Sequence, residues 1–258
     1  MRRWIIAAAA VLAACTPPTS APEGEPPQLE APSLPMADAA GNRMEALTAN
    51  ASGQFCSGDS AWCVARDASN VRFIHNGAET PLLTFTEDST PQIWPVIVRQ
   101  DDESVLIGLT WSQTAMYSGG GAEVSRVTLY KITPGVRLVP EVLTAPVSGA
   151  ISTRACFDED DVRARREACL DEYNFTGALA LDTANSSGPA RFVFTTLATS
   201  YPGVRSRSSD STEQAPLQQS DLQIVRDETC SYRRVLTFNG EGYDYDTAPP
   251  ECADYLEP

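Results

Sequence analysis

The sequence contains one histidine, His75, and one lysine, Lys131. Acid–base catalysis by histidine can therefore rest only on His75. Schiff-base chemistry can rest only on Lys131, because arginine stays protonated at physiological pH. No Cys-x-x-Cys pair occurs, so the chain lacks the usual ligand set of a zinc site. We predict neither a metal nor a cofactor.

Long hydrophobic runs are also missing. The apolar stretch from Trp4 to Ala14 has 11 residues, whereas about 20 are needed for a helix to cross a bilayer. It follows the basic residues Arg2 and Arg3 and ends in small residues. This pattern is typical of a secretory signal peptide, which we expect over residues 1–14.

The signal peptide ends in Leu12-Ala13-Ala14-Cys15, which resembles the lipobox of bacterial lipoproteins. The resemblance implies cleavage before Cys15 and a lipid on that cysteine, which would hold the protein at a membrane. In bacterial lipoproteins an acidic residue directly after the lipid-carrying cysteine implies retention at the inner membrane, and this chain has Thr16 at that position. In a Gram-negative host we therefore expect an outer-membrane lipoprotein that faces the periplasm, and surface exposure is also compatible.

Acidic residues outnumber basic ones. Without Arg2 and Arg3 the chain carries 17 basic and 34 acidic residues, a net charge of −17. Binding to nucleic acid depends on cationic side chains that neutralise phosphates, so we predict no nucleic-acid partner. The charge also disfavours an anionic lipid surface. An unknown envelope protein or cell-wall partner that is cationic fits the charge, although solubility alone explains it more simply.

Six cysteines remain after Cys15, an even number that predicts up to three disulfides in an exported chain. Six cysteines allow 15 pairings, and the sequence does not choose among them. Their spacing suggests that near neighbours pair, each bond contributing about 2–4 kcal/mol in the chain-entropy model. The suggested pairs are Cys56 with Cys63, Cys156 with Cys169, and Cys230 with Cys252.

The rest of the chain divides into a tether and a folded domain. Residues 15–50 are rich in proline, alanine and glutamate, so we expect a disordered tether, partly helical over 37–50. Residues 51–258 show apolar residues at every second position, as in Val105, Ile107 and Leu109. This predicts a mainly β fold, an antiparallel sandwich or barrel-like domain. Two small β modules divided near 140–153 are the alternative.

Turns and one helix are also marked in the sequence. Asn76-Gly77 and Asn239-Gly240 predict tight turns between strands. Ser118-Gly119-Gly120-Gly121 predicts the tip of a hairpin that joins strands over 105–116 and 124–132. The stretch Asp158 to Leu170 predicts a short, disulfide-bracketed helix, because Asp158 can cap it and acidic residues fill its first turn.

The glycine-rich tip is also the candidate recognition loop, formed by Tyr117, Ser118, Gly119, Gly120 and Gly121. A phosphate loop needs the N-terminus of a helix directly after its glycines. Here the sequence predicts a strand after them, so we do not expect a phosphate loop. Tyr117-Ser118-Gly119 resembles the Ser-Gly-containing loop that periplasmic lysozyme inhibitors insert into the cleft of the enzyme. The resemblance implies inhibition of a cationic wall-degrading enzyme through Ser118–Gly121.

Two acidic groups could hold a cation. Asp158-Glu159-Asp160-Asp161 lacks the order of a calcium loop, and four successive helical residues point in different directions. Tyr243-Asp244-Tyr245-Asp246 can form a calcium or sugar-contact edge, or a solvated edge strand protected by charge. We prefer the edge strand.

Catalytic motifs are incomplete. Gly58-Asp59-Ser60 resembles the nucleophile block of GDS hydrolases, but no histidine follows His75, so we expect a loop inside a disulfide ring. We assign no catalytic residue. The sequence favours a non-enzymatic, lipid-anchored cell-envelope protein that acts as a binding or scaffolding module. Lysozyme-type inhibition is one alternative, and a hydrolase that uses His75 is another.

Overall fold

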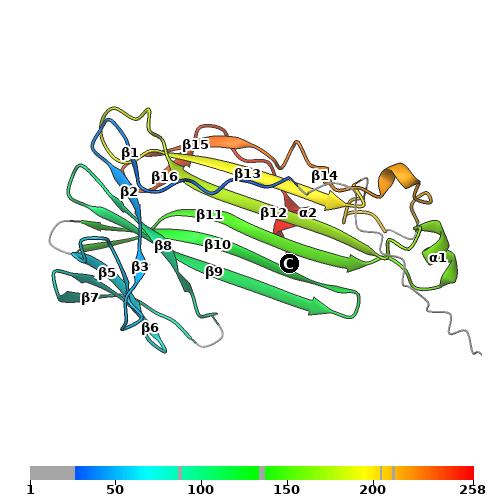
Figure 1. Ribbon diagram of the computed structural model, residues 1–258, viewed down its shortest axis with the longest axis horizontal. Helices are drawn as coiled ribbons and strands as arrows, with labels where there is room; N and C mark the ends of the chain where they lie inside the picture. The colour runs from blue at the N-terminus through cyan, green and yellow to red at the C-terminus, as the bar shows by residue number, and fades with distance from the viewer. Residues whose placement is uncertain (1–26, 87–88, 134–136, 204, 211–212) are drawn as a thin grey trace, which may run out of the picture.

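The computed structural model describes residues 27–86, 89–133, 137–203, 205–210 and 213–258 (Figure 1). Within these ranges the chain is mainly antiparallel β, with a large eleven-stranded sheet and a small five-stranded sheet. The expected fold class is therefore confirmed. The large sheet contains β1 (Met36–Ala37), β2 (Arg43–Ala46), β8 (Gln92–Arg99), β9 (Val105–Tyr117), β10 (Gly120–Thr133), β11 (Arg137–Arg154), β12 (Leu170–Leu181), β13 (Phe192–Tyr201), β14 (Val225–Arg226), β15 (Arg233–Phe238) and β16 (Tyr243–Tyr245).

The small sheet contains β3 (Thr48–Ala49), β4 (Phe55–Cys56), β5 (Trp62–Arg66), β6 (Asn70–His75) and β7 (Ala78–Thr84). The described residues also contain the short helical elements α1 (Glu159–Ala164), η2 (Gln219–Asp221) and α2 (Ala253–Leu256).

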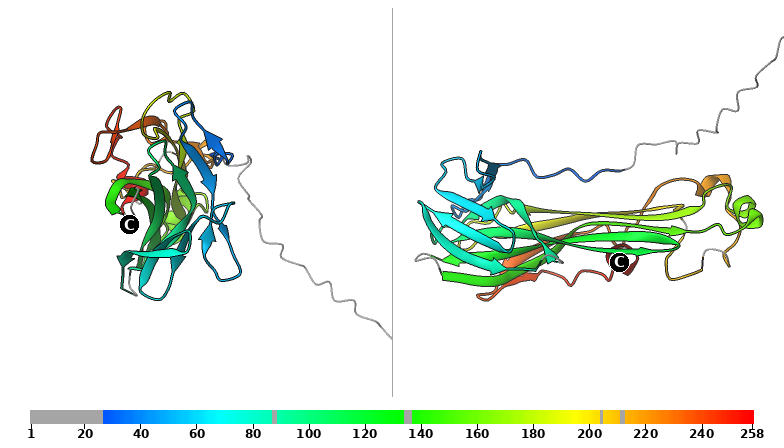
Figure 2. Two further views of the ribbon diagram at one scale, coloured as in Figure 1. Left: turned by 90° about the vertical axis from the view of Figure 1, so that its left-hand side faces the viewer. Right: turned by 90° about the horizontal axis from the view of Figure 1, so that it is seen from below.

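The molecule is elongated along the strands β9 to β13 (Figures 1 and 2). We call the end that carries the small sheet the proximal end. The distal end carries the β9–β10 turn and α1. Because β9 to β12 run antiparallel, the distal end collects the end of β9, the start of β10, the end of β11 and the start of β12. Segments far apart in the sequence therefore meet there.

The large sheet splits into two leaves in its proximal half. β11 pairs with β12 only from Ser148 to Arg154. At the split, Ser125 pairs with Ser148 and Arg126 with Pro146, which leaves Val147 as a bulge. A bulge bends a strand and increases its twist. Beyond it, β2 and β8–β11 form one leaf, and β12, β13, β15 and β16 form the other.

The main hydrophobic core lies between the two leaves. Its buried side chains come from both of them and are removed from water almost completely, which is the largest favourable contribution to folding. They are Met44, Val96, Val98, Leu106, Val127, Leu129, Val142, Leu143, Ala145, Leu179, Leu181, Ala190, Phe192, Phe194, Leu236 and Tyr243.

Loops at the proximal end hold the two leaves together around the buried Asn42. Its amide donates to the Asp38 carboxylate at 2.7 Å and to the Gly188 carbonyl at 3.0 Å, and its carbonyl accepts from the Asp101 amide at 3.1 Å. Asn185 donates to the same Asp38 carboxylate at 2.9 Å. Three loops are therefore joined by buried polar groups that are hydrogen-bonded, as burial requires.

The small sheet covers the outer face of the first leaf. Side chains of β5, β6 and β7, including Val64, Phe73 and Leu82, pack against Ile97, Ile107 and other residues of β8–β10. The proximal half therefore has three layers: the small sheet and the two leaves.

The distal half is a single sheet whose one face is covered by the C-terminal segment. Tyr173 and Phe175 of β12 pack there against Tyr255 of α2 and the Cys230–Cys252 disulfide. A Cβ on Gly149 would overlap the Tyr255 carbonyl oxygen, so only glycine permits this contact. The opposite face carries exposed residues such as Ala150 and Asn174.

Several predictions of local structure are confirmed. The three disulfides join Cys56 to Cys63, Cys156 to Cys169 and Cys230 to Cys252, as the spacing suggests. Turns follow β6 at Asn76-Gly77 and β15 at Asn239-Gly240, and both glycines have positive φ. β16 is an edge strand in which Tyr243 is buried and Asp244 is exposed.

The expected limits of the tether and helix need correction. Residues 36–49 contain β1, β2 and β3 instead of a tether with helical character. β2 pairs with β8, and Met44 is fully buried in the main core. The folded domain therefore begins well before residue 51. Residues 1–26, with the signal peptide and Cys15, lie outside the described residues.

Two further boundaries differ from expectation. The stretch 140–153, where two modules could be divided, lies inside the continuous strand β11. The helix expected over 158–170 covers only Glu159–Ala164, with Asp158 as its N-cap. Arg166 and Glu167 then adopt positive φ, which ends the helix before Cys169. No helix in the described ranges is long and apolar enough to cross a membrane.

Two methionines test whether the segment around β2 belongs to the core. Met44→Ala removes a fully buried side chain, and we expect it to lower the free energy of unfolding by about 2–5 kcal/mol. Met116→Ala removes one that is 81% exposed and should change stability by less than about 0.5 kcal/mol. Denaturant unfolding measures both. Equal stability of the two variants would contradict the placement of β2.

Candidate functional site

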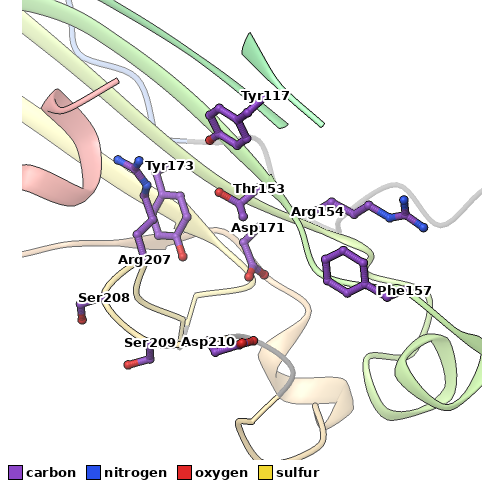
Figure 3. Close-up of a pocket in the computed structure, with 10 residues that line it drawn as sticks. All are labelled: Tyr117, Thr153, Arg154, Phe157, Asp171, Tyr173, Arg207, Ser208, Ser209 and Asp210. Atoms are coloured by element: carbon purple, nitrogen blue, oxygen red, sulfur yellow. The ribbon is translucent and has the colours of Figure 1, made fainter. Parts of the chain in front are cut away.

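A cleft of about 450 Å³ opens at the distal end (Figure 3). It brings together the ends of β9 and β11, the start of β12, the segment before α1 and the loop that follows β13. Its lining residues are Tyr117, Thr153, Arg154, Phe157, Asp171, Tyr173, Arg207, Ser208, Ser209 and Asp210. The predicted recognition loop thus contributes Tyr117 to the cleft.

The glycine-rich tip is a tight two-residue turn. Tyr117 pairs with Gly120, so only Ser118 and Gly119 lie between β9 and β10. The Gly119 carbonyl accepts a hydrogen bond from the Arg154 amide, and the Tyr117 hydroxyl donates to the Ser152 carbonyl at 3.3 Å. The hairpin tip is confirmed, but it is fastened to β11 and does not form a long protruding loop.

An aromatic ring and a guanidinium form one wall of the cleft. Phe157 follows Cys156 of the Cys156–Cys169 disulfide and is 63% exposed. The Arg154 guanidinium lies 5.1 Å from the centre of the Phe157 ring, a cation–π distance. Arg154 also donates from Nε to the Cys156 carbonyl at 2.7 Å. These contacts hold the ring in place while it faces solvent.

A buried ion pair lies behind the cleft. Arg165 and Asp171 are 3% and 1% exposed, and they form a direct hydrogen bond. Arg165 also donates from Nε to the Ala168 carbonyl at 2.9 Å, which fastens the end of α1. Burial raises the pKa of the neighbouring Tyr173 hydroxyl, and the charge of Asp171 adds to this rise.

The exposed hydrophobic surface gathers at this end. In the described part of the chain, the exposed large hydrophobic residues are Met116, Tyr117, Phe157, Val162 and Leu170. They belong to the β9–β10 hairpin, the α1 segment and the first residue of β12, which the antiparallel sheet brings to one end. Single exposed apolar residues are ordinary, but here all five come from segments that lie at one end of the molecule, with Met116 and Tyr117 on opposite faces of β9. We call these five residues the distal patch.

The acidic cluster near the cleft caps a helix. Asp158 accepts hydrogen bonds from the amides of Asp160 and Asp161 at 2.8 and 2.9 Å, the contacts of an N-cap. The Asp161 carboxylate accepts a hydrogen bond from the Phe157 backbone amide at 2.8 Å, on the other side of the N-cap residue. The described residues contain no group of three or more side chains suited to hold a metal ion.

His75 lies far from this cleft, in a proximal pocket of about 490 Å³ that Trp62, Phe73, Arg99 and Ser104 also line. Its ring stacks on Trp62, with centroids 3.6 Å apart and planes 4° apart. Its Nε2 is 3.0 Å from the Asn76 amide nitrogen. These contacts join His75 to an indole and an amide, whereas a catalytic triad requires a serine and a carboxylate.

The Gly58-Asp59-Ser60 loop closes the Cys56–Cys63 ring, as expected. Asp59 accepts two hydrogen bonds from Arg99, both at 2.9 Å, and one from Ser57 at 2.6 Å. The bonds from Arg99 and then Ser57 hold the pKa of the Asp59 carboxyl well below its usual range. Asp59 therefore fastens the ring to β8.

Lys131, the single lysine of the sequence, also has a structural partner. Lys131 forms an ion pair with Asp102 at 3.0 Å, and its ammonium lies 5.1 Å from the Phe238 ring centre. A charged amine held in this way is a poor nucleophile.

No protein-family model, curated protein or solved structure matches this chain. Sequence reasoning placed Tyr117 and the glycine-rich tip at the candidate site. It missed Phe157, Leu170 and the Arg165–Asp171 pair. The two cysteines that flank Phe157 were the available signal, because a disulfide can hold an apolar residue in solvent.

Two arginines test the buried ion pair. Arg165→Met removes the guanidinium from the buried Asp171 carboxylate, and we expect a loss of about 3–5 kcal/mol in unfolding free energy. Arg163→Met removes an exposed pair with Asp160 and should cost less than about 1 kcal/mol.

The double variant Arg165→Met with Asp171→Leu separates charge from shape. Since it leaves no buried charge, it should recover most of the stability. Denaturant unfolding of all three variants gives the comparison, and a double variant less stable than Arg165→Met would show that the pair itself is needed.

Proposed function

We propose that this chain is a lipid-anchored, non-enzymatic protein of the cell envelope that binds or scaffolds a protein partner through its distal patch. The concentration of exposed hydrophobic residues at one end of an acidic molecule carries the proposal. The chain has a net charge of −15, which keeps most of its surface well solvated. The distal patch is the exception.

The patch has the composition of a binding site for protein. Aromatic residues and methionine are enriched at the centres of protein interfaces, where they fill pockets of the partner. Phe157 and Tyr117 are also held by neighbouring groups, so little side-chain entropy is lost on binding. Polar residues of the cleft, such as Thr153 and Ser208, lie beside them and can form the polar rim.

The anchor is proposed from the lipobox resemblance. Cys15 would carry the lipid, and 11 residues separate it from residue 27, where the described chain begins. That length spans at most about 40 Å, less than the tether expected from the sequence. Leu29 and Leu34 already border the groove between Trp94 and Leu179, so a lipid on Cys15 would hold the folded domain within about that distance of the membrane.

The hydrolase alternative receives no support from the contacts of His75. Its stacking on Trp62 and its distance from the distal patch fit a structural role. Binding without chemistry therefore remains the better-supported function.

Photocrosslinking tests the distal patch in the intact envelope. A photoreactive phenylalanine analogue at Phe157 should yield a covalent adduct with a protein partner, because the ring lies in the proposed interface. The same analogue at Ala78, which is exposed at the start of β7 in the proximal half, is the control and should yield none. Gel mobility and mass spectrometry identify the products.

A second substitution checks that the patch itself is responsible. Leu170→Ser, introduced into the protein that carries the photoreactive analogue in place of Phe157, should reduce the adduct at least several-fold. It removes apolar area from the same patch. Adducts of equal yield from Ala78, or adducts with lipid alone, would contradict the proposal.

Inhibition of a cationic wall-degrading enzyme has one observation in its favour: Tyr117 of the recognition loop lines the distal cleft. If this alternative holds, the protein captures lysozyme at low salt and releases it at high salt, because salt screens charge attraction. Tyr117→Ala should weaken capture at least tenfold, and Ala78→Ser should not. A pull-down measures both, and the absence of capture at low salt excludes the alternative.

A further inference from the structure

The distal part of β9 is an open edge of the large sheet. β8 pairs with β9 only as far as Thr110, whose partner is Gln92. β10 pairs with β9 along its whole length. Within the described residues, the segment Trp111–Tyr117 therefore has a strand on one side only.

The register shows which backbone groups face outward. Tyr117 and Gly120 close the two-residue turn, so they form a hydrogen-bonded pair. Hydrogen-bonded positions alternate along an antiparallel ladder, which directs the N–H and C=O groups of Tyr117, Ala115 and Gln113 toward β10. The N–H and C=O groups of Ser112, Thr114 and Met116 then point away from the sheet.

This edge lacks the features that usually protect edge strands. Proteins block open edges with charged residues, proline or a bulge. The segment Trp-Ser-Gln-Thr-Ala-Met-Tyr has no charge and no proline, and its pairing with β10 shows no register shift. Ser112, Thr114 and Met116 are exposed. The lack of charge stands out in a chain with 34 acidic residues.

The opposite edge of the distal sheet is covered. β14 pairs with the end of β13, Thr199 opposite Arg226 and Ser200 opposite Val225. At the open edge, by contrast, no strand of the described residues pairs with Trp111–Tyr117. A groove of about 870 Å³ lies over the face of the sheet there, between this part of β9, Arg126 and Thr128 of β10, and Pro258.

We propose that a second copy of this chain occupies the edge, β9 pairing antiparallel with β9 of the second copy. An uncharged edge offers nothing for a charged partner to recognise. It does let two acidic molecules meet without opposing carboxylates along the contact. The chain's own N-terminal stretch is a poor occupant, because prolines at 17, 18, 22, 26 and 27 cannot donate to a ladder.

The end of β8 restricts the register of this pairing. The second copy must lie beyond Thr110, which favours a two-fold axis at Ala115. Thr114 then faces Met116 of the second copy, and the two hydrogen-bonded pairs give about four main-chain bonds. Gln113 faces Tyr117 of the second copy. The small Ala115 faces its own counterpart, so no bulky side chains collide at the axis.

This inference can be tested separately from the distal patch as a partner site, although Met116 and Tyr117 belong to both. Phe157 precedes α1, Val162 lies on α1 and Leu170 begins β12, so none of the three is on the β9 edge. Failure of photocrosslinking at Phe157 would leave the β9 pairing standing, and the reverse also holds.

Cysteine cross-linking of the full-length chain in its envelope tests the proposal. Two cysteines facing each other at a non-hydrogen-bonded position lie close enough to join. Ala115→Cys should therefore form a disulfide-linked dimer under mild oxidation. Ala150→Cys, an exposed alanine in the middle of the distal sheet, is the matched control. We expect at least tenfold more dimer from Ala115→Cys on a non-reducing gel.

Changes at Thr114 test whether strand pairing causes the link. Thr114→Pro removes an outward N–H and leaves the ladder with β10 intact, so it should reduce the Ala115→Cys dimer at least fivefold. Thr114→Lys, which keeps the backbone N–H, should reduce the dimer similarly, because each copy brings a charge to the axis. It serves as the second variant if the proline protein does not fold.

The outcomes separate the possible occupants. Equal dimer yields from Ala115→Cys and Ala150→Cys would overturn the proposal, whether the edge is empty or covered by another protein or by the N-terminal stretch. A dimer that survives both Thr114 changes would overturn it as well, because the contact would not be a strand pair.

Discussion

The fold depends on a change in pairing at one residue of β11. Distal to Val147, β11 pairs with β12 and the large sheet is continuous. Proximal to it, β11 continues with β10 alone, and the two leaves separate around the main core. Side chains alternate between the faces of a strand, so the extra residue at Val147 moves each side chain of β11 that precedes it to the other face. This allows Ala145 and Leu143 to point into the core between the leaves.

The same split explains why the two ends of the molecule differ. The proximal half encloses its hydrophobic residues in three layers and closes them with the Asn42 hydrogen bonds. The distal half has one sheet, with the C-terminal segment on one face. A single sheet leaves its edge and its end open unless other segments cover them. The distal patch and the β9 edge are those uncovered places, and both carry uncharged residues in a strongly acidic chain.

Much of the local structure could be predicted from the sequence. The alternation of apolar residues in β9, the turns at Asn76-Gly77 and Asn239-Gly240, and the Asp158 cap all follow from short-range rules. The disulfides join near neighbours, so local spacing was sufficient. The segment around Met44 was missed because its composition resembles a linker. Its burial comes from pairing with β8, about 50 residues later in the chain, and no local pattern shows that contact.

The candidate site shows the same division. The sequence by itself determined the acidic charge, the three local disulfide loops, the glycine-rich turn and the presence of single copies of histidine and lysine. It determined these because they depend on residue type and near neighbours. Only the tertiary structure decided that Tyr117, Phe157 and Leu170 meet at one end, that Arg165 and Asp171 are buried together, and that β9 keeps an open edge. These features depend on which strands pair and where each pairing stops, and that is set by long-range packing around the core.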